Sequence, residues 1–193
     1  MTHMIDIQSD SFPTLQTERL QISALTFDDI KRFYAYRTHP DIARYQGSFP
    51  ESEEQVEQLI HNQSRVAFGK LNQWFQFAIR LQTEQTLLGD IGLRFVSPFI
   101  PQIEIGYSIS VEYQRQGYGK ESVKAVLDHC FSNLNLQVIS AIIDVRNTAS
   151  QRMLESLGFQ RMAFRPHACF LRDEWCDEAD YALFADQWQN QQI

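Results

Sequence analysis

The stretch Gln114-Arg115-Gln116-Gly117-Tyr118-Gly119-Lys120-Glu121 separates a strand-like run, Ile103 to Ile109, from a helix-like run, Ser122 to Phe131. A strand, a glycine turn and a helix start place backbone N–H groups around one point, and the first N–H groups of a helix have no partner within it. These groups lie at the positive end of the helix dipole, where they attract an anion. Gly117 and Gly119 let the backbone approach a phosphate closely. The stretch therefore predicts an anion-binding turn.

Two common phosphate-binding motifs are excluded at this turn. It lacks the Gly-Lys-Ser/Thr ending of a nucleotide P-loop, and it lacks the three spaced glycines of a dinucleotide fingerprint. A module that binds ATP through this turn would also need a carboxylate partner for a metal ion, and none is evident. What remains is a pyrophosphate cradle of another type, or an ordinary glycine turn before a helix.

Length and composition predict one globular domain. The chain has 193 residues, of which 44% are hydrophobic and 21% charged, enough for a sizeable core and typical of a soluble protein. No apolar run is long enough to span a bilayer. The segment Met1 to Asp10 has neither the basic nor the apolar region of a secretory signal. We expect a single domain over residues 1–193, with 1–13 as a loose N-terminal lead-in.

Charge and cysteine usage restrict the partners and the compartment. The formal net charge is −7, whereas a non-specific nucleic-acid binder usually carries the opposite sign. The three cysteines, Cys130, Cys169 and Cys176, are odd in number and lack metal-ligand spacing. Free thiols of this kind favour a reducing, cytoplasmic setting. The histidines show no metal-binding or triad spacing, so we expect no metal ion.

Periodicity predicts a strand meander followed by a strand–helix–strand unit. The second unit implies a crossover and a parallel strand pair, so the fold class is α+β. The expected elements are strand Leu20–Ala24, a helix capped by Thr26 and ended at His39-Pro40, a loop over Asp41–Pro50, helix Ser52–Gly69, strands Gln73–Leu81, Leu87–Phe95 and Ile103–Ile109, helix Ser122–Phe131, strand Val138–Val145, a helix that starts in a capping box at Thr148 and runs to Leu157, strands Phe159–Phe170 and Asp180–Phe184 joined by a polar turn near Asp173, and a fraying tail from Gln187.

Several segments resemble one family, in its order and with its spacing. The pattern Gln114-x-x-Gly117-x-Gly119 is similar to the acyl-CoA pyrophosphate loop of the GCN5-related N-acetyltransferases (GNAT). The other matches resemble the RimJ/RimL-like branch of this family and extend over nearly the whole chain. They are Thr17-Glu18-Arg19-Leu20, Glu104-Ile105-Gly106-Tyr107, Asn147-Thr148-Ala149-Ser150, Leu157-Gly158-Phe159, and Trp175-Cys176-Asp177 with Tyr181.

The resemblance implies a GNAT fold: a mixed, mostly antiparallel sheet whose central strands splay apart, flanked by helices, with acetyl-CoA in the gap as co-substrate. Backbone amides from Gln116 to Lys120 would hold the pyrophosphate, and the Tyr107–Ile109 strand would pair with the pantetheine amides. The residues expected to bind acetyl-CoA are Tyr107, Ser108, Ile109, Gln114, Arg115, Gln116, Gly117, Tyr118, Gly119, Lys120 and Asn147.

The implied reaction is direct transfer of an acetyl group from the thioester to a primary amine in a ternary complex. Glu104, a carboxylate on a strand that otherwise reads as core, is the candidate general base. The alternative is a solvated charge on an open face of the sheet, since alternation does not fix which face is wet. Asp90 on the neighbouring strand is a second base candidate.

Asn147 and Ser150 complete the expected catalytic group. The resemblance suggests that Asn147 contacts the cofactor or substrate, and the alternative is a helix N-cap, which asparagine performs well. Ser150 could protonate or stabilise the departing thiolate, or it could satisfy local backbone in the first turn of a helix.

The expected partners are acetyl-CoA and an amine-bearing acceptor, either a protein or peptide N-terminus or a small amine. We expect no nucleic-acid or membrane partner. A homodimer built on the C-terminal strands is compatible with the resemblance. A rival hypothesis is a catalytically inactive acyl-CoA-binding sensor, which would keep the glycine turn and lack a working base.

Overall fold

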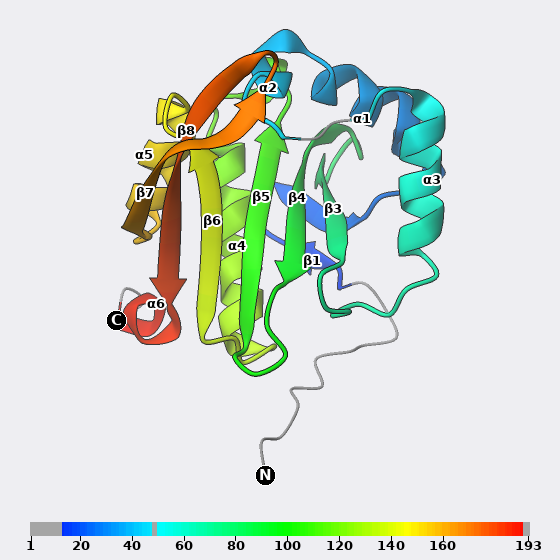
Figure 1. Cartoon of the computed structure of the whole chain (residues 1–193). Helices are drawn as coiled ribbons and strands as arrows, with labels where there is room; N and C mark the ends of the chain where they lie inside the picture. The colour runs from blue at the N-terminus through cyan, green and yellow to red at the C-terminus, as the bar shows by residue number, and fades with distance from the viewer. Residues whose placement is uncertain (1–12, 48–49, 191–193) are drawn as a thin grey trace.

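The computed structural model describes residues 13–47 and 50–190. The predicted lead-in falls almost entirely outside this range. Figure 1 shows one twisted sheet with helix α4 (Tyr118–Ser132) behind it. Helices α1 (Ile30–Arg37) and α2 (Pro40–Ala43) lie at one end of the sheet, and α3 (Glu53–Gln63) lies along one side (Figure 1). The shorter helical elements are η1 (Phe27–Asp29), η2 (Val111–Tyr113), α5 (Thr148–Ser156) and α6 (Ala185–Asn190).

The sheet has eight strands in the order β1-β2-β3-β4-β5-β6-β8-β7. Every neighbouring pair is antiparallel except β5–β6, which is parallel, as the strand–helix–strand order predicted. The predicted α+β class with a mixed, mostly antiparallel sheet is therefore confirmed. The strands are β1 (Leu15–Gln16), β2 (Leu20–Ala24), β3 (Trp74–Leu81), β4 (Leu87–Phe95), β5 (Gln102–Ile109), β6 (Val138–Asp144), β7 (Gln160–Leu171) and β8 (Glu174–Phe184).

The two central strands splay apart, as predicted. The parallel pairing of β5 and β6 runs only from Gln102↔Val138 to Glu104↔Ser140. Both strands continue beyond this point with their outer neighbours, β5 with β4 as far as Ile109 and β6 with β8 as far as Asp144. The side of β5 that faces β6 therefore has no strand partner after Glu104 among the described residues.

The main core lies between the sheet and α4. One face of α4 carries buried Val123, Val126, Leu127 and Cys130, which pack with the odd-numbered side chains of the central strands. A second core cluster joins α1 and α3 to the other face of β3, where Ala78 leaves room for them. No helix within the described parts of the chain combines the length and the apolar character needed to cross a membrane.

The second predicted helix is too long by six residues. Helix α3 ends at Gln63, because the segment after it turns back to bury an aromatic side chain. Phe68 packs edge-on against Phe75 and Phe95, with ring centroids 5.2 and 5.4 Å apart. Packing in the sheet core thus overrides the helical pattern that extended to Gly69.

The loop predicted over 41–50 contains a short helix. Pro40 ends α1 but occupies the first turn of α2, where its missing N–H costs nothing. The His39 side chain caps this helix by accepting a hydrogen bond from the Asp41 N–H. The last part of the predicted loop, residues 48–49, lies outside the described residues.

Two helix starts also differ from the prediction. Helix α4 begins at Tyr118, inside the glycine motif, with Gly117 as its N-cap. The capping box predicted Thr148 as the cap of α5, but the cap is Asn147, the alternative given above for this residue: its Oδ1 accepts a hydrogen bond from the Ser150 N–H at 3.1 Å.

The C-terminal region is more ordered than predicted. Strand β8 starts at Glu174, six residues earlier than expected, because the turn consists only of Arg172 and Asp173, both with positive φ. The polar tail forms α6, in which Trp188 is buried and donates a hydrogen bond to Asp128 at 3.0 Å. One buried indole therefore anchors a segment whose composition predicted fraying.

Candidate functional site

The glycine turn presents a row of unpaired backbone donors. Gly117 adopts φ +85° and Arg115 φ +59°, which turns successive N–H groups toward the start of α4. The N–H groups of residues 115 to 120 donate to no acceptor in the parts of the chain that the structure describes. Together with the positive end of the α4 dipole, they form a site suited to an anion.

The turn is braced by the N-terminal Thr-Glu-Arg-Leu segment. The Arg19 guanidinium lies 2.6 Å from the Glu121 carboxylate and donates to the Gln116 carbonyl at 3.1 Å. Thr17 donates a second hydrogen bond to Glu121 at 2.5 Å, and Arg19 also stacks on the Tyr118 ring at 4.4 Å. The role of this segment, a clamp on the glycine turn, was missed at the level of sequence.

The clamp predicts a pH-dependent stability. Burial raises the pKa of Glu121, but hydrogen bonds from Thr17 and Arg19 and the Arg19 charge outweigh it, so the net pKa lies below its ordinary value. A carboxyl whose pKa falls on folding stabilises the folded state above its unfolded pKa of about 4.3 and loses this contribution as pH falls through its folded pKa. Chemical denaturation should therefore show a stability difference between wild type and Glu121→Gln that is full near pH 7 and shrinks in acid.

Glu84→Gln is the matched control for this prediction, because Glu84 is exposed in the β3–β4 turn and forms no ion pair among the described residues. An equal pH dependence in the two variants would contradict the clamp.

The far wall of the gap is formed by the start of α5. Ser150, in its first turn, is buried, and its Oγ lies 2.8 Å from the Tyr107 hydroxyl on β5. Burial raises the pKa of Tyr107 well above its ordinary value, an effect that the Ser150 hydrogen bond opposes. The Tyr107 hydroxyl therefore keeps its proton, and the two hydroxyls connect β5 to the start of α5 across the gap.

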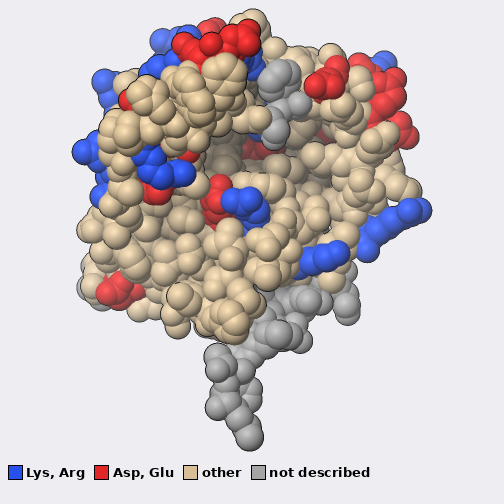
Figure 2. Space-filling model, viewed as in Figure 1, with Lys and Arg blue, Asp and Glu red and all other residues tan. Residues whose placement is uncertain are grey.

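A cavity of about 780 Å³ opens on the sheet face opposite α4. Its size falls in the range of ligand sites, ~300–1,000 Å³. Figure 2 shows this hollow, with acidic and basic side chains next to each other at its centre. The cavity is lined from the sheet by Trp74, Asp90, Arg94, Glu104 and Tyr107, from α1 and the segment after α2 by Phe33, Arg37, Tyr45 and Gln46, and from the C-terminal half by Asp144, Asn147, Ser150, Cys169 and Cys176.

Glu104 faces this cavity and is largely shielded, with 15% of its side chain exposed. It lies directly opposite Arg94 on β4, and the two side chains form an ion pair. The alternation of side chains along β5 did not show whether the face with Glu104 is open to solvent. In the structure this face is the wall of a cavity. Glu104 is also the last residue of β5 that pairs with β6, so its carboxylate lies at the apex of the gap.

Asp90 is engaged in a buried network. It is 1% exposed, accepts a hydrogen bond from the Tyr36 hydroxyl at 2.7 Å and lies 3.5 Å from the Arg37 guanidinium. Burial raises the pKa of Asp90, while Arg37 and Tyr36 act in the opposite direction. The neighbouring Ser108 side chain accepts a hydrogen bond from Arg37 at 3.0 Å, so the network attaches α1 to β4 and β5.

The Asp90 network predicts a stability effect at Tyr36. Tyr36→Phe leaves the buried carboxyl without its closest donor, and the free energy of unfolding is expected to fall by ~1–3 kcal/mol. Tyr34→Phe is the control, because the Tyr34 hydroxyl donates to the Glu51 carbonyl at an exposed position and should cost within about 0.5 kcal/mol. Equal losses in urea denaturation would show that Tyr36 does not support Asp90.

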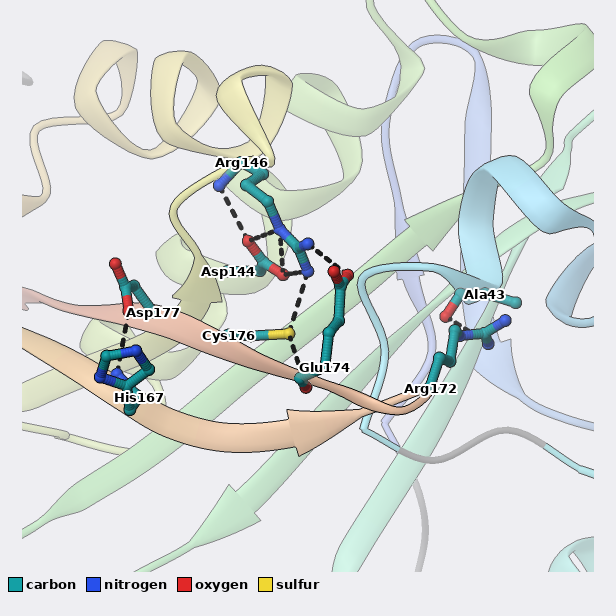
Figure 3. Close-up of polar contacts among 8 residues, drawn as sticks. All are labelled: Ala43, Asp144, Arg146, His167, Arg172, Glu174, Cys176 and Asp177. Atoms are coloured by element: carbon teal, nitrogen blue, oxygen red, sulfur yellow. Dashed lines mark hydrogen bonds and ion pairs between the residues drawn. The ribbon is translucent and has the colours of Figure 1, made fainter.

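The tip of the β7–β8 hairpin arches beside the cavity and is held at two points (Figure 3). On one side Arg146 contacts Asp144 at 2.6 Å and the Cys176 sulfur at 2.9 Å, and also reaches Glu174. On the other side Arg172 donates to the Ala43 carbonyl at the end of α2, at 2.8 Å. Burial raises the pKa of Asp144, but the bonds from Arg146 outweigh it and leave the pKa below its ordinary value.

The sequence-predicted residues fall into two groups. The structure brings Glu104, Tyr107, Asn147 and Ser150 to one cavity and places the glycine turn at the end of the β5 strand. Other side chains are turned to structural bonds: Gln114 donates to the Ile109 carbonyl, Gln116 to the Glu112 carbonyl, Lys120 to the Ser156 carbonyl, and Ser108 lies in the Asp90 network.

Comparison with known proteins decides the family. Residues 19–160 match the model of the acetyltransferase (GNAT) domain. This chain belongs to the GNAT acetyltransferase family. The match covers Arg19 of the clamp, the splayed strands, the glycine turn and α5, so the described architecture is that of an N-acetyltransferase.

Individual GNAT relatives agree with this assignment. An uncharacterized N-acetyltransferase of Bacillus subtilis, YoaA, is 32% identical over 151 residues, which cover 78% of this chain and 84% of YoaA. The crystal structure of a GNAT-family acetyltransferase from Bacillus anthracis superposes with a TM-score of 0.80 at 25% identity, over 90% of this chain and 99% of that one. Spermidine N(1)-acetyltransferase of Escherichia coli is 21% identical over 174 residues, 88% of each chain.

Members of the GNAT family use acetyl-CoA as co-substrate. The described residues contain no group of three or more His, Cys, Asp or Glu side chains arranged to hold a metal ion.

Proposed function

We propose that this chain transfers an acetyl group from acetyl-CoA to a primary amine, of a protein or peptide N-terminus or of a small molecule, directly in a ternary complex. One observation carries the proposal: the side of β5 that has no strand partner among the described residues begins after Glu104 and leads to the glycine turn. An acyl donor with amides and a pyrophosphate would find strand-like backbone along the gap and free N–H groups at its end.

The donor side of the gap fits acetyl-CoA. The unpaired N–H groups from Gln116 to Lys120 would hold the pyrophosphate, and the backbone of Tyr107 to Ile109 would pair with the pantetheine amides. Glu121, the acidic side chain of the motif, is paired with Arg19 and does not present an isolated negative charge to phosphates. The Gln114 bond to the Ile109 carbonyl fixes the turn to the end of β5.

On the amine side, Glu104 is favoured over Asp90 as the general base. The Glu104 carboxylate, although paired with Arg94, reaches the cavity at the apex of the gap, whereas Asp90 is 1% exposed and bonded to both Tyr36 and Arg37. A base must lie within hydrogen-bond reach of the proton that it removes. In this proposal Glu104 accepts a proton from the acceptor ammonium, which leaves the amine free to attack the thioester.

Ser150 and Tyr107 would stabilise the leaving thiolate. Their hydroxyls lie 2.8 Å apart on the two sides of the gap, and the raised pKa of Tyr107 keeps its proton in place for donation. Asn147 acts through its cap on α5, which orients Ser150 by accepting the Ser150 N–H. Asn147 is thus a positioning residue in this proposal, and its cavity-facing location allows contact with the cofactor.

The acceptor in this proposal is a protein N-terminus or a small amine. The RimJ/RimL-like motifs favour a protein N-terminus, and a relative named for spermidine keeps small amines as a second class. The three free cysteines are compatible with a reducing, cytoplasmic setting. The alternative, an inactive acyl-CoA-binding sensor, would bind acetyl-CoA without turnover.

Calorimetric titration with acetyl-CoA, followed by free-thiol release against a panel of amines and N-terminal peptides, tests this proposal. Binding with amine-dependent thiol release is expected. Binding without release on every acceptor would favour the sensor, and absence of binding would contradict the assignment of the glycine turn.

A further inference from the structure

Arg94 and Glu104 form an ion pair where the strands diverge. They are direct partners in the β4–β5 register, and Glu104 is the last β5 residue paired with β6. The Ser140 hydroxyl holds the same point by donating to the Ile103 carbonyl at 3.1 Å. If the chain acts as proposed above, a fixed positive charge lies next to the group that must receive the acceptor amine.

Trp74 holds this guanidinium in place. Its indole lies over Gly92 and Gly106, which face each other across β4 and β5. A Cβ at Gly92 would come within 3.0 Å of Trp74 Cε3, and one at Gly106 within 3.8 Å of Trp74 Cη2. The ring can lie flat across the two strands because Gly92 has no side chain. The Arg94 Cζ lies 5.2 Å from the centre of the indole, within the range of a cation–π contact.

The other carboxylates of the cavity are also matched by arginines. Asp90 lies 3.5 Å from Arg37, Asp144 lies 2.6 Å from Arg146, and Glu178 lies 2.9 Å from Arg165. Each carboxylate that lines the cavity thus has a guanidinium partner. A linear polyamine carries several ammonium groups, and each would need a carboxylate of its own or would meet a like charge. The cavity therefore suits an acceptor with a single ammonium.

We propose that Arg94 determines acceptor specificity: held between Trp74 and Glu104, it admits an acceptor with one amine and an otherwise uncharged body, and it excludes polyamines. The remaining lining supports this class, since Phe33, Tyr45 and Leu59 present apolar surface and Gln55 and Gln76 present neutral amides. The acceptor class is thus a monoamine, such as the N-terminus of a peptide with uncharged side chains. This inference rests on the proposed function.

The test compares two acceptors, spermidine and a short peptide amide whose only charge is its N-terminus. The ratio of their kcat/KM values is measured for wild type, Arg94→Gln, Arg94→Lys and Arg161→Gln. Arg161 is exposed on β7 outside the cavity lining, so its variant controls for the change in net charge. Wild type should prefer the peptide. Arg94→Gln should shift the ratio toward spermidine by about tenfold or more, the effect of about 1.4 kcal/mol of discrimination.

Arg94→Lys should keep the wild-type preference, because it keeps the charge, and Arg161→Gln should leave the ratio unchanged. If Arg94→Gln does not fold, Arg94→Met replaces it, since the apolar stem can still pack on Trp74. A preference of wild type for spermidine, or an unchanged ratio in a folded uncharged variant, would overturn the proposal.

Calorimetric binding of spermidine without acetyl-CoA separates this inference from the proposed function. Spermidine should bind Arg94→Gln about tenfold more tightly than wild type or better, and Arg161→Gln like wild type. If wild type bound spermidine tightly, the specificity role of Arg94 would be wrong even if amine acetylation were established. If wild type acetylated no amine while spermidine binding followed the expected pattern, the proposed acetyl transfer would be wrong. The proposed exclusion of polyamines by Arg94 would still be supported.

Discussion

Replacing Glu104 with glutamine is expected to lower kcat by about 10²- to 10⁴-fold, the usual contribution of a general base. Glutamine keeps the size of the side chain and can still accept a hydrogen bond from Arg94, but it cannot take a proton from the acceptor ammonium. Acetyl-CoA affinity should not change, because the donor contacts of the proposal lie along β5 beyond Glu104 and at the glycine turn. Steady-state thiol release and calorimetric titration measure the two quantities on the same sample.

The control for this variant is Glu57→Gln, because Glu57 is an exposed residue of α3 that does not line the cavity. Its kcat should equal that of wild type. An unchanged kcat in Glu104→Gln would remove Glu104 from the chemistry and leave the Arg94 pair as a purely structural contact. A parallel loss of acetyl-CoA affinity would show instead that the apex of the gap supports donor binding.

Replacing Gly117 with valine is expected to weaken acetyl-CoA binding by about tenfold or more, equivalent to ~1.4 kcal/mol or more. Gly117 has φ +85°, a conformation that a β-branched residue adopts at a cost of ~1–2 kcal/mol. A Cβ at this position would also lie 3.2 Å from Arg19 Nη2, a part of the clamp. Relief of either strain rotates the N–H groups that the proposal assigns to the pyrophosphate.

Gly69→Val provides the matched comparison. Gly69 has φ +98° in the segment between α3 and β3, so valine suffers a similar backbone strain outside the glycine turn. Both variants should lose stability in thermal unfolding, and only Gly117→Val should lose acetyl-CoA affinity. If both bound acetyl-CoA like wild type, the turn would not be the pyrophosphate site.

The sequence predicted the central part of this fold well, because its signals there are local. Alternating residues marked β3, β4 and β5, and the two glycines marked the turn before α4. It failed where one distant contact decides the outcome. The segment after α3 places Phe68 against Phe95 on the sheet, and Trp188 bonds to Asp128 and anchors α6 in a polar tail. Phe95 and Asp128 are both far in sequence from the residues that they contact, so periodicity could not reveal these contacts.

The candidate site shows the same division. The types of residue needed for acyl transfer could be selected from motifs, and Glu104, Asn147 and Ser150 do lie at one cavity. The partner of Glu104 could not be selected, because the pairing with Arg94 depends on the exact register of β4 and β5. The role of Arg19 likewise depends on a contact with Glu121 across 102 positions of sequence. Strand register and long-range ion pairs are properties of the folded chain.

A single-turnover experiment tests the central claim most directly. The protein is first loaded with acetyl-CoA, then mixed with buffer or with a primary-amine acceptor, and free thiol and acetylated amine are measured in rapidly quenched samples. We predict no thiol release before the amine is added, and equal amounts of thiol and acetylated amine afterwards. Stoichiometric thiol release without amine, or failure of every amine to release thiol from bound acetyl-CoA, would contradict direct acetyl transfer by this chain.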